Sequence, residues 1–133
     1  MSTTRTRPWL VLGVAVIVFE LGVGTALAHD HTHGPTTTTG GSCTKKGLHY
    51  QNSVFPAIYA TTEEVSSCSS VQAKLCYLDN TTGNFDLNVQ TTAGTIATAS
   101  GDHFGHIYWS DHNGLSGSTW WGFRLADHTT SSC

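Results

Sequence analysis

The alternation of apolar and polar residues in the second half of the chain restricts the fold more than any other feature. Apolar residues alternate with polar ones or cysteine at 71–77 and again at 85–89. Side chains two residues apart share one face of a β-strand, so this period predicts half-buried strands. Turn-forming residues at 79–84 and 92–94 separate these strands from each other and from a third at 95–100. We therefore predict an all-β fold, an antiparallel meander closed as a small β-sandwich or barrel.

The stretch 103–128 holds three of the four tryptophans and is predicted to form two strands around a turn at Asn113-Gly114. Neighbours on a strand face opposite ways, so Trp121 should lie in the core and Trp120 at the surface. The whole predicted core consists of Val71, Leu75, Tyr77, Phe85, Leu87, Val89, Ile96, Ile107, Trp109, Trp121, Phe123 and Leu125.

Four cysteines provide the covalent framework: Cys43, Cys68, Cys76 and Cys133. An even count in a small exported chain predicts two disulfides. Three pairings are possible, and we favour Cys43–Cys68 with Cys76–Cys133, because the second bridge ties the last residue back to a strand. A thiolate zinc site is less favoured, since no C-x-x-C spacing is present.

Residues 1–28 have the pattern of a cleaved signal peptide. Arg5 and Arg7 precede an apolar run at 9–19, and Ala26-Leu27-Ala28 supplies small residues for cleavage. A transmembrane anchor is less favoured, because Glu20 interrupts a span that would need about 20 apolar residues. We therefore predict a secreted, extracellular protein.

The remaining residues are few enough for one domain, which we place at 43–133. Residues 29–133 carry four basic and eight acidic side chains, a net charge of −4 with neutral histidines. Binding to nucleic acid needs clustered basic residues, as does binding to an anionic membrane, so neither partner is expected. The chain also lacks the common catalytic motifs, and we expect no enzymatic activity.

Residues 29–42 are predicted to be a flexible tail rich in histidine and threonine. Cleavage after Ala28 would begin the mature chain with His29-Asp30-His31. Its amine, two amides and the third-position imidazole can surround Cu(II) or Ni(II) in a square plane. His33 adds another imidazole. No cofactor is required by this pattern, and an ion bound to a flexible tail is expected to leave the thermal midpoint unchanged. The alternative is a solvated spacer that happens to contain histidine.

The function predicted from these features is recognition of an extracellular carbohydrate or protein. The proposed surface is an aromatic and polar sheet face made by His106, Tyr108, Trp120 and Arg124, where rings stack on a partner and polar groups orient it. An extracellular Cu/Ni/Zn-binding protein acting through its histidine-rich N-terminus is the alternative. Metal binding by His103, His106, His112 and His128, with Asp102, Asp111 and Asp127 beside them, is less favoured than ordinary surface histidines next to turn-capping aspartates.

Overall fold

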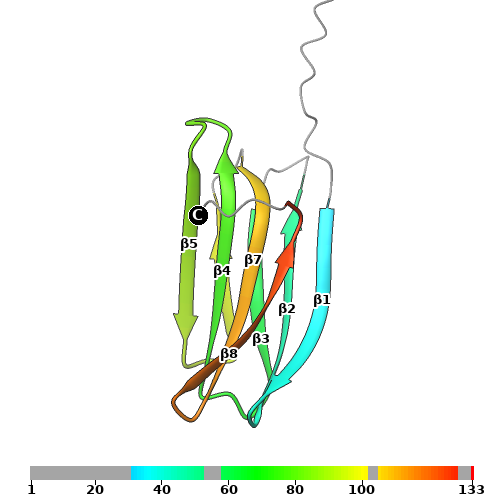
Figure 1. Ribbon diagram of the computed structural model, residues 1–133, viewed down its shortest axis with the longest axis vertical. Helices are drawn as coiled ribbons and strands as arrows, with labels where there is room; N and C mark the ends of the chain where they lie inside the picture. Colours follow the sequence, from blue (N-terminus) through cyan, green and yellow to red (C-terminus); the bar gives the residue numbers. More distant parts are fainter. Residues whose placement is uncertain (1–30, 53–57, 102–104, 129–132) are drawn as a thin grey trace, which may run out of the picture.

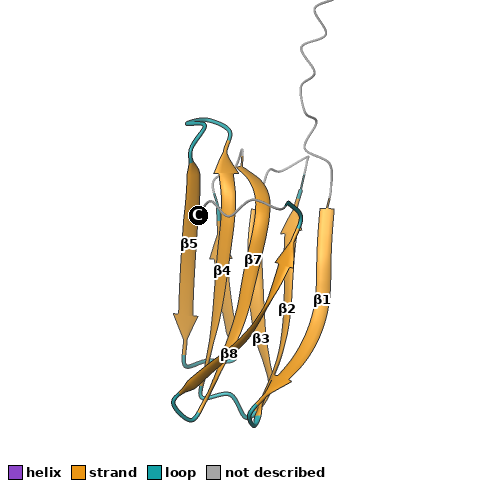
Figure 2. Cartoon of the chain, viewed as in Figure 1, coloured by secondary structure: helices purple, strands orange, loops and turns teal. Residues whose placement is uncertain are grey.

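The computed structural model describes residues 31–52, 58–101, 105–128 and 133, and every regular element in them is a β-strand (Figure 2). The strands form two antiparallel sheets of four, which lie as two layers (Figure 1). The first sheet contains β1 (His31–Gly40), β2 (Cys43–Gln51), β3 (Ile58–Ser66) and β6 (Ile96–Ser100), in that order. The second has the order β5 (Phe85–Thr92), β4 (Ser70–Asp79), β7 (Gly105–Ser116) and β8 (Thr119–Ala126).

The all-β class and both disulfides are confirmed. Cys43 is bonded to Cys68 and Cys76 to Cys133. Two disulfides in a small β domain are typical of extracellular proteins. Within the described ranges, no helix is long and apolar enough to cross a membrane. The predicted signal peptide lies outside the described residues.

The order of the strands is more complex than the predicted meander. Strands β1, β2 and β3 follow one another as a meander in the first sheet, but the chain then changes sheet between β3 and β4, β5 and β6, and β6 and β7. Each change moves the chain to the facing layer. The result is a two-layer, sandwich-like arrangement whose sheets share one interior.

The prediction of a flexible tail at 29–42 is wrong for most of its length. Residues 31–40 form β1, which pairs with β2 from His31↔Gln51 to Gly40↔Cys43. Threonine is β-branched and favours strands, and here β2 supplies a pairing edge that the local sequence does not reveal. The folded unit therefore includes residues 31–40 and does not begin at Cys43.

The predicted turn at Asn113-Gly114 is also wrong, because β7 runs straight through it. The hairpin closes at Gly117, whose φ of 62° lies in the left-handed region that glycine tolerates. Ser116 pairs with Thr119 across this turn. Gly114 instead lies against the Cys43–Cys68 disulfide, where a Cβ would collide with the sulfur of Cys43.

The apolar core is smaller than predicted. Residues from both sheets form it: Ile58, Ala60, Val71, Ala73, Leu75, Tyr77, Ala97, Ala99 and Ile107. Of the other predicted core residues, Trp109 and Leu125 are buried, whereas Phe85, Leu87, Val89, Ile96 and Trp121 are exposed and Phe123 is partly exposed. Strands β5 and β6 are sheet edges, and Leu87 and Val89 pair with outward-facing residues of β4. Trp121 lies over Gly40 at the end of β1 and remains 46% exposed.

A bulge in β7 changes which residues face the interior. The register with β4 passes from Tyr77↔Ile107 to Cys76↔Trp109, leaving Tyr108 as the extra residue. Ser110 therefore joins Ile107 on the inner face, and Trp109 turns outward. The Arg124 guanidinium covers the Trp109 ring at 3.8 Å from its centroid.

The half of the interior between β2 and β7 is polar. Buried polar side chains gather there and near the adjoining strand ends: Lys45, His49, Gln51, Thr62, Asp79, Ser110 and His112. Burying such groups is unfavourable unless they are hydrogen-bonded. These buried side chains therefore require hydrogen-bond partners inside the protein.

Candidate metal centre

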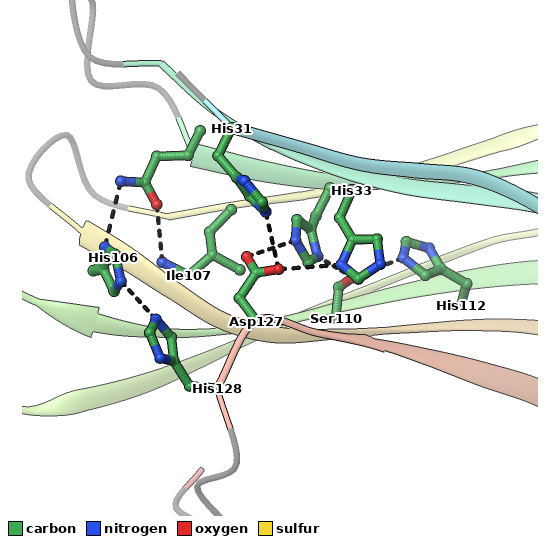
Figure 3. Close-up of polar contacts among 10 residues, drawn as sticks. His31, His33, His106, Ile107, Ser110, His112, Asp127 and His128 are labelled. Carbon is green, nitrogen blue, oxygen red and sulfur yellow. Dashed lines mark hydrogen bonds and ion pairs between the residues drawn. The ribbon is translucent and has the colours of Figure 1, made fainter. Parts of the chain in front are cut away.

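Three histidines and one aspartate converge where the edges of the two sheets meet. His31 and His33 come from β1, His49 comes from β2, and Asp127 directly follows β8. One donor atom from each lies within 4.8 Å of the others. Figure 3 shows the Asp127 carboxylate facing the imidazoles of His31 and His33.

Each imidazole contacts the carboxylate directly. His31 Nε2 lies 3.0 Å from Asp127 Oδ1, and His33 Nδ1 lies 3.1 Å from the same oxygen. His49 Nε2 lies 2.8 Å from Oδ2. The carboxylate thus accepts hydrogen bonds from all three rings, which come from positions 78 to 96 residues away in the chain.

Strand pairing explains why these residues meet. His31 and His33 are two residues apart on β1 and share one face, and His33 pairs with His49 across the sheet. Their rings lie 5.3 Å apart between centroids. The Asp127 backbone is anchored from the other sheet, since its N–H donates to the carbonyl of Tyr108, the bulge residue of β7.

The electrostatics of the cluster favour an ionised carboxylate. Desolvation raises the pKa of Asp127, but hydrogen bonds from the three imidazoles and the charge of His49 outweigh it, so the net pKa is lowered well below the usual range. A carboxylate that stays ionised is also a competent metal ligand.

A pocket of about 390 Å³ connects this cluster with solvent. Its lining includes His31, His33 and Asp127, together with His106 and His128. The last two form a separate pair whose Nε2 atoms lie 2.8 Å apart (Figure 3). An ion can therefore reach the four-residue cluster from outside, while the fully buried His49 closes its inner side.

His112, expected at the surface, is completely buried between the sheets. Burial is the main reason that its pKa falls to about 4, and the charge of His49 lowers the pKa further. The charge of Asp111 and a hydrogen bond to the Thr61 backbone oppose this shift. The ring stacks against Phe123 at 5.2 Å between centroids. At neutral pH, His112 is therefore an uncharged part of the interior.

Gly47 is the position that makes room for His112. A Cβ at Gly47 would collide with Cγ of the imidazole, which hydrogen bonds and Phe123 hold in place. We expect Gly47→Ala to lower the free energy of unfolding by about 1–3 kcal/mol, as overpacking of a filled interior does. Urea unfolding measures this. Gly94→Ala, whose Cβ would meet only Thr92 Oγ1 at 3.2 Å, should cost less than about 0.5 kcal/mol. Equal losses would contradict this role of Gly47.

The structure describes two of the four predicted metal ligands and places both in the cluster. His29 and Asp30 lie outside the described residues, whereas His31 and His33 lie in the cluster. Sequence reasoning missed His49 and Asp127. The local pattern gave no signal for His49, because the apolar Leu48 and Tyr50 of β2 are partly exposed while the non-apolar Lys45, Gly47, His49 and Gln51 form its buried face.

The residues predicted to recognise a carbohydrate or protein do not form one platform. His106 and Tyr108 lie together near the start of β7, with ring centroids 5.9 Å apart. Trp120 pairs with Leu115 near the other end of this strand, roughly 23–30 Å from them at about 3.3 Å per residue. Arg124 makes a two-pronged contact with Asp111 and covers Trp109. Recognition through these residues stays a prediction.

Comparison of the chain with protein families, with curated proteins and with solved structures found no match.

Proposed function

We propose that this protein binds a divalent transition-metal ion, Zn²⁺ or Cu²⁺, through His31, His33, His49 and Asp127. The observation that carries the proposal is the convergence of three imidazoles and a low-pKa carboxylate. Imidazole-rich sets with one carboxylate suit these ions. The cysteines contribute no ligand, because all four are in disulfides.

The spacing of the donor atoms supports this assignment. Ligand atoms about 2.0–2.2 Å from a tetrahedral Zn²⁺ lie roughly 3.2–3.6 Å from one another. The four donors of the cluster already lie within 4.8 Å. Small inward movements of His31 and His33, which are partly exposed, would complete the shell. The proposal includes export, since the disulfides and the pattern at 1–28 are both typical of secreted proteins.

The competing explanation is a purely structural hydrogen-bond cluster, in which Asp127 satisfies three imidazoles without a metal. The two explanations differ in a direct titration. Metal-free protein, prepared with a chelator, is titrated with Zn²⁺ and separately with Cu²⁺ by calorimetry at pH 7.4. We expect one equivalent to bind, with at least about a tenfold loss of affinity in His33→Ala and in Asp127→Asn, as the removal of a ligand from a shared shell requires.

His106→Ala is the matched control, because His106 lines the same pocket but lies outside the cluster. Its affinity should stay near that of the unsubstituted chain. A chain extended by one residue before His29 separates this site from the amino-terminal site, which requires the free amine of His29. Full binding by the extended chain together with loss in His33→Ala supports the cluster. The reverse pattern, or the absence of any binding, would refute it.

A further inference from the structure

We infer that a buried chain of hydrogen bonds, from the Gln72 carbonyl through Thr62, His112 and Ser110 to His49, orients the His49 ring so that Nε2 faces the metal ion. The inference rests on the proposed function and deepens it. It makes Ser110, His112 and Thr62 positioning residues of the metal site, although none of them is a ligand.

The donor and the acceptor in each of these hydrogen bonds can be assigned by starting at the backbone carbonyl of Gln72. The Thr62 hydroxyl donates to the Gln72 carbonyl oxygen at 2.9 Å, because a carbonyl only accepts. A hydroxyl has one proton to give, so Thr62 Oγ1 must accept from His112 Nδ1, which lies 3.0 Å away. His112 therefore carries its proton on Nδ1, and its Nε2 is an acceptor.

The same reasoning assigns the donors and acceptors between His112 and the metal site. Ser110 Oγ lies 2.8 Å from His112 Nε2 and donates its proton there. Its oxygen then accepts from His49 Nδ1, also at 2.8 Å. With Nδ1 donating to Ser110, His49 gives its other N–H, on Nε2, to Asp127 Oδ2 in the metal-free protein. A metal ion bound there replaces the proton that the contact with Asp127 otherwise holds.

Burial keeps water away from these hydrogen bonds. His49, Thr62, Ser110 and His112 all have exposed fractions of 0%. Water therefore cannot substitute for a missing partner without a cavity to hold it. The low pKa of His112 is consistent with a single-proton ring at neutral pH. Metal-bound histidines commonly donate their second N–H to another group, and losing that partner typically weakens metal binding about 10–100-fold.

Paired substitutions at Thr62 and Ser110 test the inference in the full chain. Ser110→Ala removes the acceptor of His49, and Zn²⁺ affinity should fall about 10–100-fold. Thr62→Val keeps the shape but removes the hydroxyl, and should weaken binding about tenfold, toward the low end of that range. Thr62→Ser restores the hydroxyl and should restore the affinity. Thr61→Val, on the outward face of the same strand, is the matched control and should bind normally.

Nitrogen NMR of the imidazoles provides a readout that a merely structural role would not change. In the zinc-bound protein, His49 should show a protonated Nδ1 and a metal-bound Nε2, and His112 a protonated Nδ1. In Ser110→Ala, the His49 Nδ1 proton should exchange faster. Unchanged affinity in both Ser110→Ala and Thr62→Val, or coordination through His49 Nδ1, would overturn the inference but leave metal binding intact. A flat zinc titration of the unsubstituted chain would instead refute the proposed function.

Discussion

Zn²⁺ is expected to raise the thermal midpoint of the chain by about 10–20 °C at a free concentration one hundred times its dissociation constant. Binding to the folded state alone contributes about 2.7 kcal/mol under that condition, and a domain of this size gains about 4–8 °C per kcal/mol. The ligands come from β1, β2 and the residue after β8, so only the folded chain assembles them. Differential scanning calorimetry with chelator and with Zn²⁺ measures the shift.

This expectation is the opposite of the one for a flexible tail. An ion held by His29, Asp30 and His31 alone would bind folded and unfolded chain alike, and the midpoint would not move. His33→Ala should abolish most of the shift, while His106→Ala should preserve it. If calorimetry detects bound metal but the thermal midpoint stays constant, the ion is bound by His29, Asp30 and His31 and not by the cluster.

Without metal, the free energy of unfolding is expected to fall by about 3 kcal/mol between pH 6.5 and about 4 because of His112, from a pKa lowered to about 4 against an unfolded value of 6.5. In this window the unfolded chain takes up a proton at His112 and the folded chain does not. Protonation therefore favours unfolding, and stability falls as the pH falls. Urea titrations at several pH values, with chelator present, give the slope.

His112→Gln is the comparison that isolates this residue, because glutamine cannot titrate. Its stability should depend less on pH in that window, even if its overall stability is lower. The lowered pKa of Asp127 acts in a different window: its contribution is present above the unfolded value of 3.8 and is lost only as the pH falls below it. The same slope in His112→Gln as in the unsubstituted chain would show that other groups cause the dependence.

The strand class was predictable because its signal is local. The alternation at 71–77 and 85–89 predicted β4 and β5 within a few residues. The disulfide pairing was predicted by a topological argument, that the last residue should be tied to a strand, and β4 provides that strand through Cys76.

The facing of the strands was less predictable, because it depends on partners. A one-residue bulge at Tyr108 reverses the sheet face to which Ser110 and Trp109 point. No local sequence pattern predicts this bulge. In β2, Leu48 and Tyr50 are partly exposed while His49 is buried, the opposite of the usual rule. Hydrogen bonds to Ser110 and Asp127 make the burial of His49 tolerable, and these partners lie 61 and 78 residues away.

By itself, the sequence determined that this chain forms β-strands, that its cysteines pair in two disulfides and that histidines near its start are candidates for metal binding. Periodicity and residue chemistry are enough for those conclusions, because both are properties of neighbouring residues. Only the tertiary structure decided that His31 and His33 belong to a strand and meet His49 and Asp127. A metal centre requires donor atoms a few ångströms apart, and sheet pairing across distant segments is what brings these atoms together.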